Sequence, residues 1–231
     1  MHRHPHRHRS IGGTVVTDEH QGRSAAAVFD RLGAAYEKAF SGSEAHRRSL
    51  DWLLTRLAPG SRVLDVGSGT GVPTARTLAD AGHEVLGVDV SSVMVELAAR
   101  QVPGASFRCA DIREVSLDDG SFDAVCVYFS LLQLDRPEQA DVMRRLVRAL
   151  TPAGHLVLAT VPVDVAGVDA VFMGQPVRVS SFSPPGCAAL AEDAGLEVLD
   201  RQELLFTPAH PDAGPEPQLF LHCRRRPPAS A

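Results

Sequence analysis

Apolar positions in the first 60 residues recur at helical spacing. Helical composition extends from residue 25 to residue 57 and is interrupted by the tripeptide Ser41-Gly42-Ser43. After the interruption, four leucines follow the i, i+3, i+4, i+7 pattern that lines one face of a helix: Leu50, Leu53, Leu54 and Leu57. The pattern predicts two helices ahead of the first strand.

From residue 61 onward, short apolar runs alternate with helical segments. The expected strands are residues 62–66, 84–88, 106–110, 122–128 and 155–161, and the expected helices are residues 72–81, 92–100 and 137–150. Strands that alternate with helices of this length predict a parallel sheet with helices on both faces.

The chain changes character after residue 161. Residues 162–185 are rich in glycine and proline and are expected to form an irregular lid or a wall of a substrate pocket. A helix over residues 187–194 and strands over residues 196–205 and 218–224 complete the pattern, with a proline-rich loop at 207–217. One domain fits the length of 231 residues.

The net charge of the chain limits the kinds of molecule that it is expected to bind. The formal net charge is −5, and the first ten residues contribute three arginines and no acid, so the remainder carries −8. An acidic body disfavours nucleic acid as a partner. Residues 1–22 are expected to be a disordered tail rich in histidine and arginine, with a metal-binding tract as the alternative.

Cysteine and apolar content indicate a cytoplasmic protein. The four cysteines form no C-x-x-C pair, so we expect reduced thiols, with Cys109 and Cys126 as core residues of strands. No apolar run approaches the roughly 18 residues of a membrane span, and no signal-peptide apolar region precedes the first helix. No membrane partner is expected.

The chemistry concentrates at the end of the first expected strand. Asp65 is followed there by Gly67, Gly69 and Gly71. Glycines let the backbone turn sharply and let a ligand approach the main chain. A dinucleotide site needs the spacing G-x-G-x-x-G, but Val72 occupies the position of its third glycine. Because Asp65 would repel a pyrophosphate, we predict a cationic ligand without phosphate.

The segment Asp65-Val66-Gly67-Ser68-Gly69-Thr70-Gly71 resembles the first motif of class I S-adenosylmethionine-dependent methyltransferases. The resemblance continues in order through Asp89, which ends the second strand, Asp111, and the turn at residues 150–156, and it covers about residues 61–160. It implies a Rossmann-like α/β fold with a seven-stranded, mostly parallel sheet of order 3-2-1-4-5-7-6. The last strand would be antiparallel.

The resemblance also implies a single methyltransferase domain over residues 23–231. Its expected parts are an N-terminal helical cap at 23–58, a cofactor-binding core at 61–161, the lid at 162–185, and a terminal helix and hairpin at 186–224.

S-adenosyl-L-methionine is the cofactor that this resemblance implies, with S-adenosyl-L-homocysteine as product. Asp89 would bind both ribose hydroxyls. Asp111 would accept the adenine amino group or, alternatively, cap the following turn. Tyr36 would cover the methionine moiety or pack between helices, and Met94 would contact adenine or belong to the core. The expected cofactor-binding residues are Tyr36, Asp65, Gly67, Ser68, Gly69, Gly71, Asp89, Val90, Met94, Asp111, Ile112 and Tyr128.

The acceptor side is expected to follow the fourth strand and to include the lid, with contacts from Phe129, Gln133, Phe172 and Met173. No catalytic base is assigned. His46 and His210 are candidates because their segments are able to fold over the site, whereas His83, His155 and His222 are expected to be structural. No metal ligands are predicted.

The leading interpretation is an enzyme that methylates a small organic acceptor, with O-methylation favoured over N- or C-methylation. A catalytically silent cofactor-binding regulator or scaffold is the alternative. Val72 and Asp65 disfavour a nicotinamide oxidoreductase. The segment Tyr128-Phe129-Ser130-Leu131 lacks the Asn/Asp-Pro-Pro-Tyr signature of nucleic-acid base methyltransferases. The acceptor's identity and the oligomeric state stay open.

Overall fold

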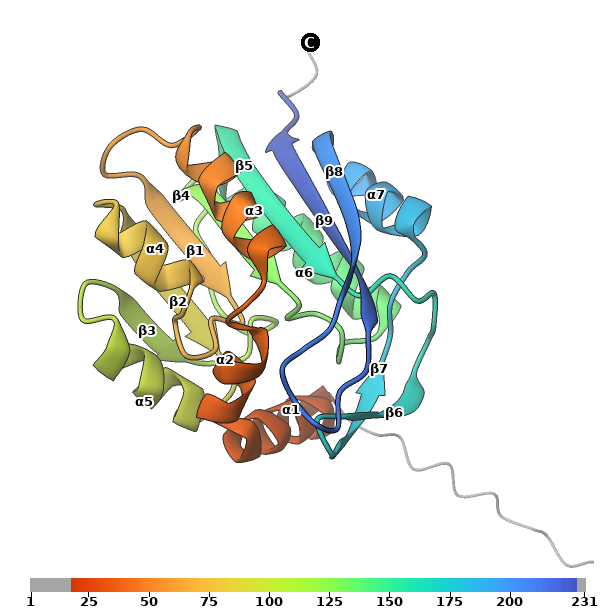
Figure 1. Cartoon of the computed structure of the whole chain (residues 1–231). Helices are drawn as coiled ribbons and strands as arrows, with labels where there is room; N and C mark the ends of the chain where they lie inside the picture. The colour runs from red at the N-terminus through yellow and green to blue at the C-terminus, as the bar shows by residue number, and fades with distance from the viewer. Residues whose placement is uncertain (1–17, 228–231) are drawn as a thin grey trace, which may run out of the picture.

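A seven-stranded sheet forms the centre of the computed structural model, which describes residues 18–227 (Figure 1). The strand order is β3-β2-β1-β4-β5-β9-β8; β1 to β5 pair in parallel, and β9 is antiparallel to both neighbours. Counted within this sheet, the order is 3-2-1-4-5-7-6, so the expected fold is confirmed. The strands are β1 (Arg62–Val66), β2 (Glu84–Asp89), β3 (Ser106–Cys109), β4 (Phe122–Tyr128), β5 (Leu150–Thr160), β8 (Leu196–Phe206) and β9 (Glu216–Arg225).

Helices cover both faces of this sheet because its strands alternate between two apolar cores. Val125 and Val127 of β4 pack into a core that includes residues of α6 (Arg136–Ala149) and α7 (Pro184–Asp193). Ala124 and Cys126 point the other way, into a core with α3 (Glu44–Leu54) and α4 (Thr74–Asp80). This period of two is what a strand buried on both faces requires. The remaining core helix is α5 (Ser92–Gln101).

Three helices, rather than the expected two, precede β1. The first is α1 (Asp18–Leu32), the second is α2 (Ala34–Phe40), and α3 follows. Gly33 separates α1 from α2 at φ 47° and ψ −132°, a conformation open to glycine that ends a helix. Since α1 begins at Asp18, it takes in the last five residues of the expected tail at 1–22. Residues 1–17, with the histidine and arginine tract, lie outside the described residues.

The expectation of an irregular segment at 162–185 is wrong. Within it, β6 (Val168–Phe172) and β7 (Gln175–Val179) form an antiparallel hairpin. Met173 and Gly174 connect them with φ values of 47° and 76°, the positive pair that a tight hairpin turn needs. Val177 and Met173 pack against Val28 and Leu32 of α1. The hairpin and α1 therefore lie together below the carboxyl ends of the parallel strands, as Figure 1 shows.

All four cysteines are free thiols, but Cys109 is exposed and not a core residue as expected. It ends β3, which lies at the edge of the sheet and is exposed at most of its positions. No helix of the described chain is long and apolar enough to cross a membrane. Within the same residues, no cluster of three or more histidine, cysteine or acidic side chains is placed to hold a metal ion.

Candidate functional site

A pocket of about 250 Å³ lies at the carboxyl ends of β1, β2 and β4. The sheet side contributes Gly67, Gly69, Asp89 and the residues that follow β3 and β4. The opposite side is built from aromatic residues of α1 and α2 and from the β6–β7 hairpin. Ligands of open α/β sheets bind at this edge, where the strand order reverses between β1 and β4.

The glycine loop after β1 is shaped by close contacts with its neighbours. Gly67, Gly69 and Gly71 have φ values of 68°, 52° and 79°. A Cβ on Gly67 would lie 2.2 Å from the Cβ of Ser130, whereas a Cβ on Gly69 would meet nothing within 4 Å. Gly67 thus lets β1 and the loop after β4 approach each other, and Gly69 faces open space in the pocket.

Two other predicted residues of this loop face away from the pocket. Gly71 packs against Phe107 and Val102, each 3.1 Å from where its Cβ would lie. The hydroxyl of Ser68 is buried without a hydrogen-bond partner. Neither residue lines the pocket.

Asp89 lines the pocket and links β2 to the glycine loop. Its Oδ2 accepts a hydrogen bond from the Gly69 amide at 2.8 Å, and its Oδ1 accepts one from the Ser91 amide at 2.9 Å. Burial raises the pKa of Asp89, and these backbone hydrogen bonds oppose that shift. Each oxygen keeps further acceptor capacity, so the carboxylate fits a vicinal diol such as ribose.

Asp65 lies at the same loop but under the pocket surface. Its side chain is 2% exposed, and Oδ2 has no hydrogen-bond partner. Burial, followed by repulsion from Asp89, raises the pKa of Asp65 to about 8. A positive charge on a ligand beside Asp65 would lower this pKa and favour the ionised form of the side chain. The two acids together therefore fit a cationic, hydroxyl-bearing ligand, and they fit a phosphate poorly.

An aromatic cluster covers the pocket. Tyr36 lies 5.6 Å from Phe29, 4.9 Å from Phe40 and 6.3 Å from Phe172, measured between ring centroids. Burial raises the pKa of Tyr36, with added effects of Glu216 and Asp89, so its hydroxyl stays protonated. The structure thus brings two predicted residues, Tyr36 and Phe172, together although 136 positions separate them in the chain.

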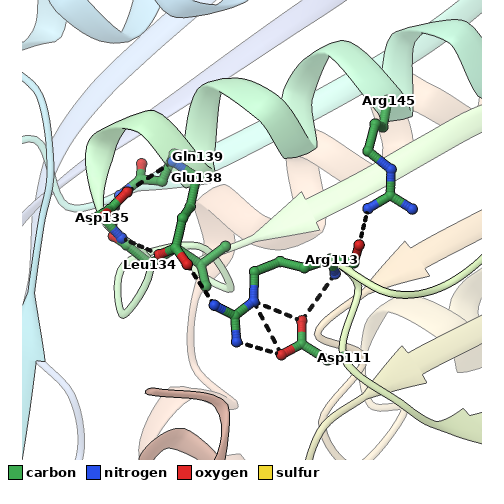
Figure 2. Close-up of polar contacts among 7 residues, drawn as sticks. All are labelled: Asp111, Arg113, Leu134, Asp135, Glu138, Gln139 and Arg145. Carbon is green, nitrogen blue, oxygen red and sulfur yellow. Dashed lines mark hydrogen bonds and ion pairs between the residues drawn. The ribbon is translucent and has the colours of Figure 1, made fainter. Parts of the chain in front are cut away.

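Asp111, expected to bind adenine, is engaged by Arg113 (Figure 2). Oδ1 accepts from the backbone amide of Arg113 at 2.9 Å, and Oδ2 accepts from Nη2 at 2.7 Å. Burial alone would raise the pKa of Asp111, but the hydrogen bonds and charge of Arg113 lower it. Ala110 and Ile112 line the pocket, whereas Asp111 does not. The arrangement matches the alternative of a capped turn, and the adenine contact stays a prediction.

Arg113 also ties this turn to α6. Its Nη1 donates to Glu138 Oε1 at 2.5 Å, and Glu138 belongs to the capping box of α6 with Asp135 (Figure 2). Arg145 donates from further along α6 to the carbonyl of Ile112 at 3.0 Å. The loop that carries Ala110 and Ile112 into the pocket is therefore fixed from the helix behind it.

Neither histidine candidate lines the pocket. His46 shares a hydrogen bond of 2.9 Å with Thr74, and its ring centroid lies 3.9 Å from that of Tyr128. Burial lowers the pKa of His46 to about 3, so the ring is neutral. His210 accepts a hydrogen bond from the amide of Asp212 in the loop before β9.

A chain of hydrogen bonds runs from the pocket wall to the surface behind Tyr128. The Tyr128 hydroxyl lies 3.0 Å from Ser49 Oγ, which lies 2.9 Å from His222 Nε2. His222 Nδ1 lies 3.0 Å from Asp200 Oδ2. Ser49 is fully buried, and the Asp200 side chain is 56% exposed. His222, expected to be structural, fixes a pocket residue through Ser49.

On the acceptor side, Phe129, Gln133 and Phe172 line the pocket, and Met173 does not because it packs on α1. On the cofactor side, four further predicted residues line the pocket: Val90, Met94, Ile112 and Tyr128. Sequence reasoning missed Ser130 and Glu216. Glu216 opens β9, and since the expected strand began at residue 218, no local pattern pointed to it.

Comparisons with known proteins identify a methyltransferase domain in the chain. A family model described as a methyltransferase domain matches residues 63–154. A demethylmenaquinone methyltransferase from Renibacterium salmoninarum is 34% identical over 138 residues, which are 58% of this chain and 57% of the relative. The methyltransferase GfsG from Streptomyces halstedii is 33% identical over 172 residues, 68% of this chain and 61% of the relative. The chain thus spans less than two thirds of these relatives' length.

Among solved structures, the 1,6-didemethyltoxoflavin-N1-methyltransferase from Burkholderia thailandensis, with 1,6-didemethyltoxoflavin and S-adenosylhomocysteine bound, has a TM-score of 0.70. The match covers 94% of this chain and 93% of that one at 21% identity, so it bears on the fold alone. Domain match and sheet order lead to one conclusion: residues 63–154 form a methyltransferase domain, within a chain that has the fold of the class I S-adenosylmethionine-dependent methyltransferases.

Proposed function

We propose that the chain binds S-adenosylmethionine in this pocket and transfers its methyl group to a small organic acceptor, with O-methylation favoured. The observation that carries the proposal is the pair Asp65 and Asp89 at the glycine loop, next to a chamber with aromatic walls. The family match over residues 63–154 supports the reaction class.

The residues divide into a cofactor half and an acceptor half. Asp89 would hold the ribose hydroxyls, and Asp65, protonated in the ligand-free protein, would ionise beside the ligand's positive charges. Val90, Met94 and Ile112 would surround the adenine with apolar contacts. When bound, the cofactor supplies a methyl group on a sulfonium. The protein then has to hold the acceptor in line and exclude water, which is where alignment gives its rate advantage.

The acceptor half favours a small molecule. It is lined by Phe129, Phe172, Val161 and Val171, and its polar groups include Ser130, Gln133 and Glu216. A pocket of about 250 Å³ with mostly apolar and aromatic walls and few polar groups is of the kind that binds small organic molecules. The acidic body likewise supports a small acceptor over nucleic acid.

Calorimetry with S-adenosylhomocysteine tests the cofactor half. Asp89→Asn replaces the charged carboxylate, which would accept hydrogen bonds from both ribose hydroxyls, by a neutral amide. Since hydrogen bonds to charged groups contribute about 1.5–3 kcal/mol, we expect the affinity to fall at least tenfold. The exposed Asp119 supplies a matched control, Asp119→Asn, which should bind as wild type does. Equal affinities of the Asp89 variant and wild type would refute the ribose assignment.

Methyl transfer to a panel of small hydroxyl, amine, carboxyl and thiol compounds, with protein and RNA alongside, tests the acceptor half. Methylation confined to the macromolecules would overturn the proposal. Tight cofactor binding with no turnover of any compound would instead support a cofactor-binding regulator or scaffold. That alternative gains weight from one observation, namely that neither histidine candidate lines the pocket.

A further inference from the structure

The geometry points to Glu216 as the carboxylate that receives the acceptor's proton, and to a phenolic or enolic hydroxyl as the group methylated. This inference rests on the proposed function and names its substrate class. Glu216 is the first residue of β9, and it lines the pocket on the acceptor side, beside the hairpin and the aromatic cluster. Neither the family match, which ends at residue 154, nor the glycine loop includes it.

Neighbouring elements hold Glu216 in place. The loop before it is attached to α2 by a hydrogen bond of 2.8 Å from the Ala209 amide to the Ala39 carbonyl. Phe206, which ends β8 opposite Glu216 in the register, lies 5.7 Å from Phe40 between ring centroids. The carboxylate thus stands on a strand end that is anchored to the pocket's aromatic cover.

One oxygen of Glu216 has a partner and the other is available. Gln218 Nε2 donates to Oε1 at 2.8 Å, and the Gln218 side chain is fully buried. Among residues 18–227, no further hydrogen bond and no ion pair to Glu216 is formed. Gln218 therefore orients the carboxylate and leaves Oε2 to accept a hydrogen bond from a ligand.

The surroundings make this carboxylate a better base than an exposed glutamate. Burial raises the pKa of Glu216, and the hydrogen bond from Gln218 only partly offsets the shift. Tyr36 is close enough for the charge of Glu216 to raise its pKa further, after the larger effect of burial. Described cations that pair with other carboxylates, such as Arg113 and Arg136, are bound elsewhere. A proton donor in the ligand is thus the natural partner of Oε2.

Methylation of the hydroxyl oxygen is coupled to loss of its proton. The acceptor's O–H bond breaks, and its proton goes to Glu216 Oε2 while the electron pair stays on oxygen. That oxygen forms the new bond to the methyl carbon as the sulfur–carbon bond breaks, and its electrons stay on sulfur, which becomes a neutral thioether. The carboxylic acid of Glu216 then returns its proton to water.

Acidity selects the class of hydroxyl. A phenol such as the tyrosine side chain has a pKa of about 10, within about six units of an ordinary glutamate and nearer to one whose pKa is raised. The pKa of an aliphatic hydroxyl is closer to that of water, about 16, so a carboxylate accepts its proton much less readily. The aromatic lining favours flat rings in addition. We therefore expect phenols and enols in the acceptor half, and simple alcohols to be poor acceptors.

A coloured phenol tests the inference without turnover. 4-Nitrophenol absorbs at different wavelengths as phenol and as phenolate. The absorbance of the bound dye therefore reports its protonation at each pH, and the protein is saturated with S-adenosylhomocysteine for this measurement. A carboxylate at Oε2 holds the neutral phenol and repels the phenolate. We expect the bound dye to titrate at higher pH than the free dye. In Glu216→Gln the ratio of phenol to phenolate at a fixed pH should fall at least tenfold.

The matched control is Glu84→Gln, at the exposed start of β2 on the opposite edge of the sheet, which should leave the dye's titration unchanged. An unchanged titration in Glu216→Gln, or no binding of 4-nitrophenol to wild type, would overturn the inference. Stronger binding of benzylamine than of the dye would overturn the hydroxyl class. If S-adenosylhomocysteine itself does not bind, the proposed function fails instead, so the two failures are distinguishable.

Discussion

Replacing Asp65 by asparagine should stabilise the ligand-free protein at neutral pH while it weakens cofactor binding. The carboxylate is buried with one oxygen lacking a hydrogen-bond partner, and its pKa rises from 3.8 to about 8. Between these values the folded state binds a proton that the unfolded state has released. Stability is therefore greatest below the unfolded pKa and is lost as pH rises through the folded one.

The size of the effect follows from this linkage. Between pH 5 and pH 7 the folded protein holds nearly one extra proton on Asp65, so its unfolding free energy falls by about 1.4 kcal/mol for each pH unit. The asparagine of the variant would not titrate. The unfolding free energy of Asp65→Asn should accordingly exceed that of wild type by about 1 kcal/mol more for each pH unit over this range. This figure is below 1.4 kcal/mol because the protein relaxes around the buried charge.

Urea denaturation of both proteins at pH 5, 6 and 7 measures the difference, and other titrating groups cancel in it. Asp119→Asn, at an exposed position, should show a difference that is independent of pH. A constant difference for Asp65→Asn as well would refute the reasoning, because it would mean that Asp65 is ionised in the folded state at pH 5. The same variant should bind S-adenosylhomocysteine more weakly than wild type.

Three further predictions concern the framework of the site. Gly67→Ala should lower the unfolding free energy by about 2–4 kcal/mol in urea denaturation, because its Cβ would lie 2.2 Å from that of Ser130, whereas Gly69→Ala, with open space, should cost about 1 kcal/mol. Ser49→Ala leaves two buried partners without their hydrogen bond and should cost about 2 kcal/mol, and an unchanged melting temperature would contradict this. Arg113→Met should cost about 3 kcal/mol at pH 7 and less in acid, because Arg113 lowers the pKa of Asp111 and the ion pair is lost once Asp111 is protonated; an equal cost at neutral and acid pH would contradict the ion pair.

The parts of the fold that were predictable are those with a strong local pattern. Strand β4 is predicted at its observed bounds because it is apolar on both faces, and the sheet order is implied by the family resemblance that the motifs after β1 and β2 carry. The β6–β7 hairpin is not predicted, because Gly174 and Pro176 are also typical of irregular structure. In fact Gly174 supplies a positive φ for a tight turn, and Pro176 lies in a two-stranded sheet where a missing amide costs little.

The site was predictable where a ligand-facing residue belongs to a short motif. Gly67, Gly69 and Asp89 are of this kind, and all three line the pocket. Asp111 was not resolved by its motif, since the competing partner Arg113 lies only two residues away. Glu216 carries no motif at all. Its place in the pocket depends on how β9 inserts between β5 and β8, a pairing between segments far apart in the chain.

The series Asp200, His222 and Ser49 has the bonding order of a hydrolase triad and none of its access. Ser49 is fully buried and shares its hydroxyl with Tyr128, so no ester or amide carbonyl can reach it. A search for triads by interatomic distance alone would select these three residues and assign a nucleophile to this protein. What separates the two functions is which member meets solvent. In a hydrolase the serine must be open to substrate, and here only the aspartate is exposed.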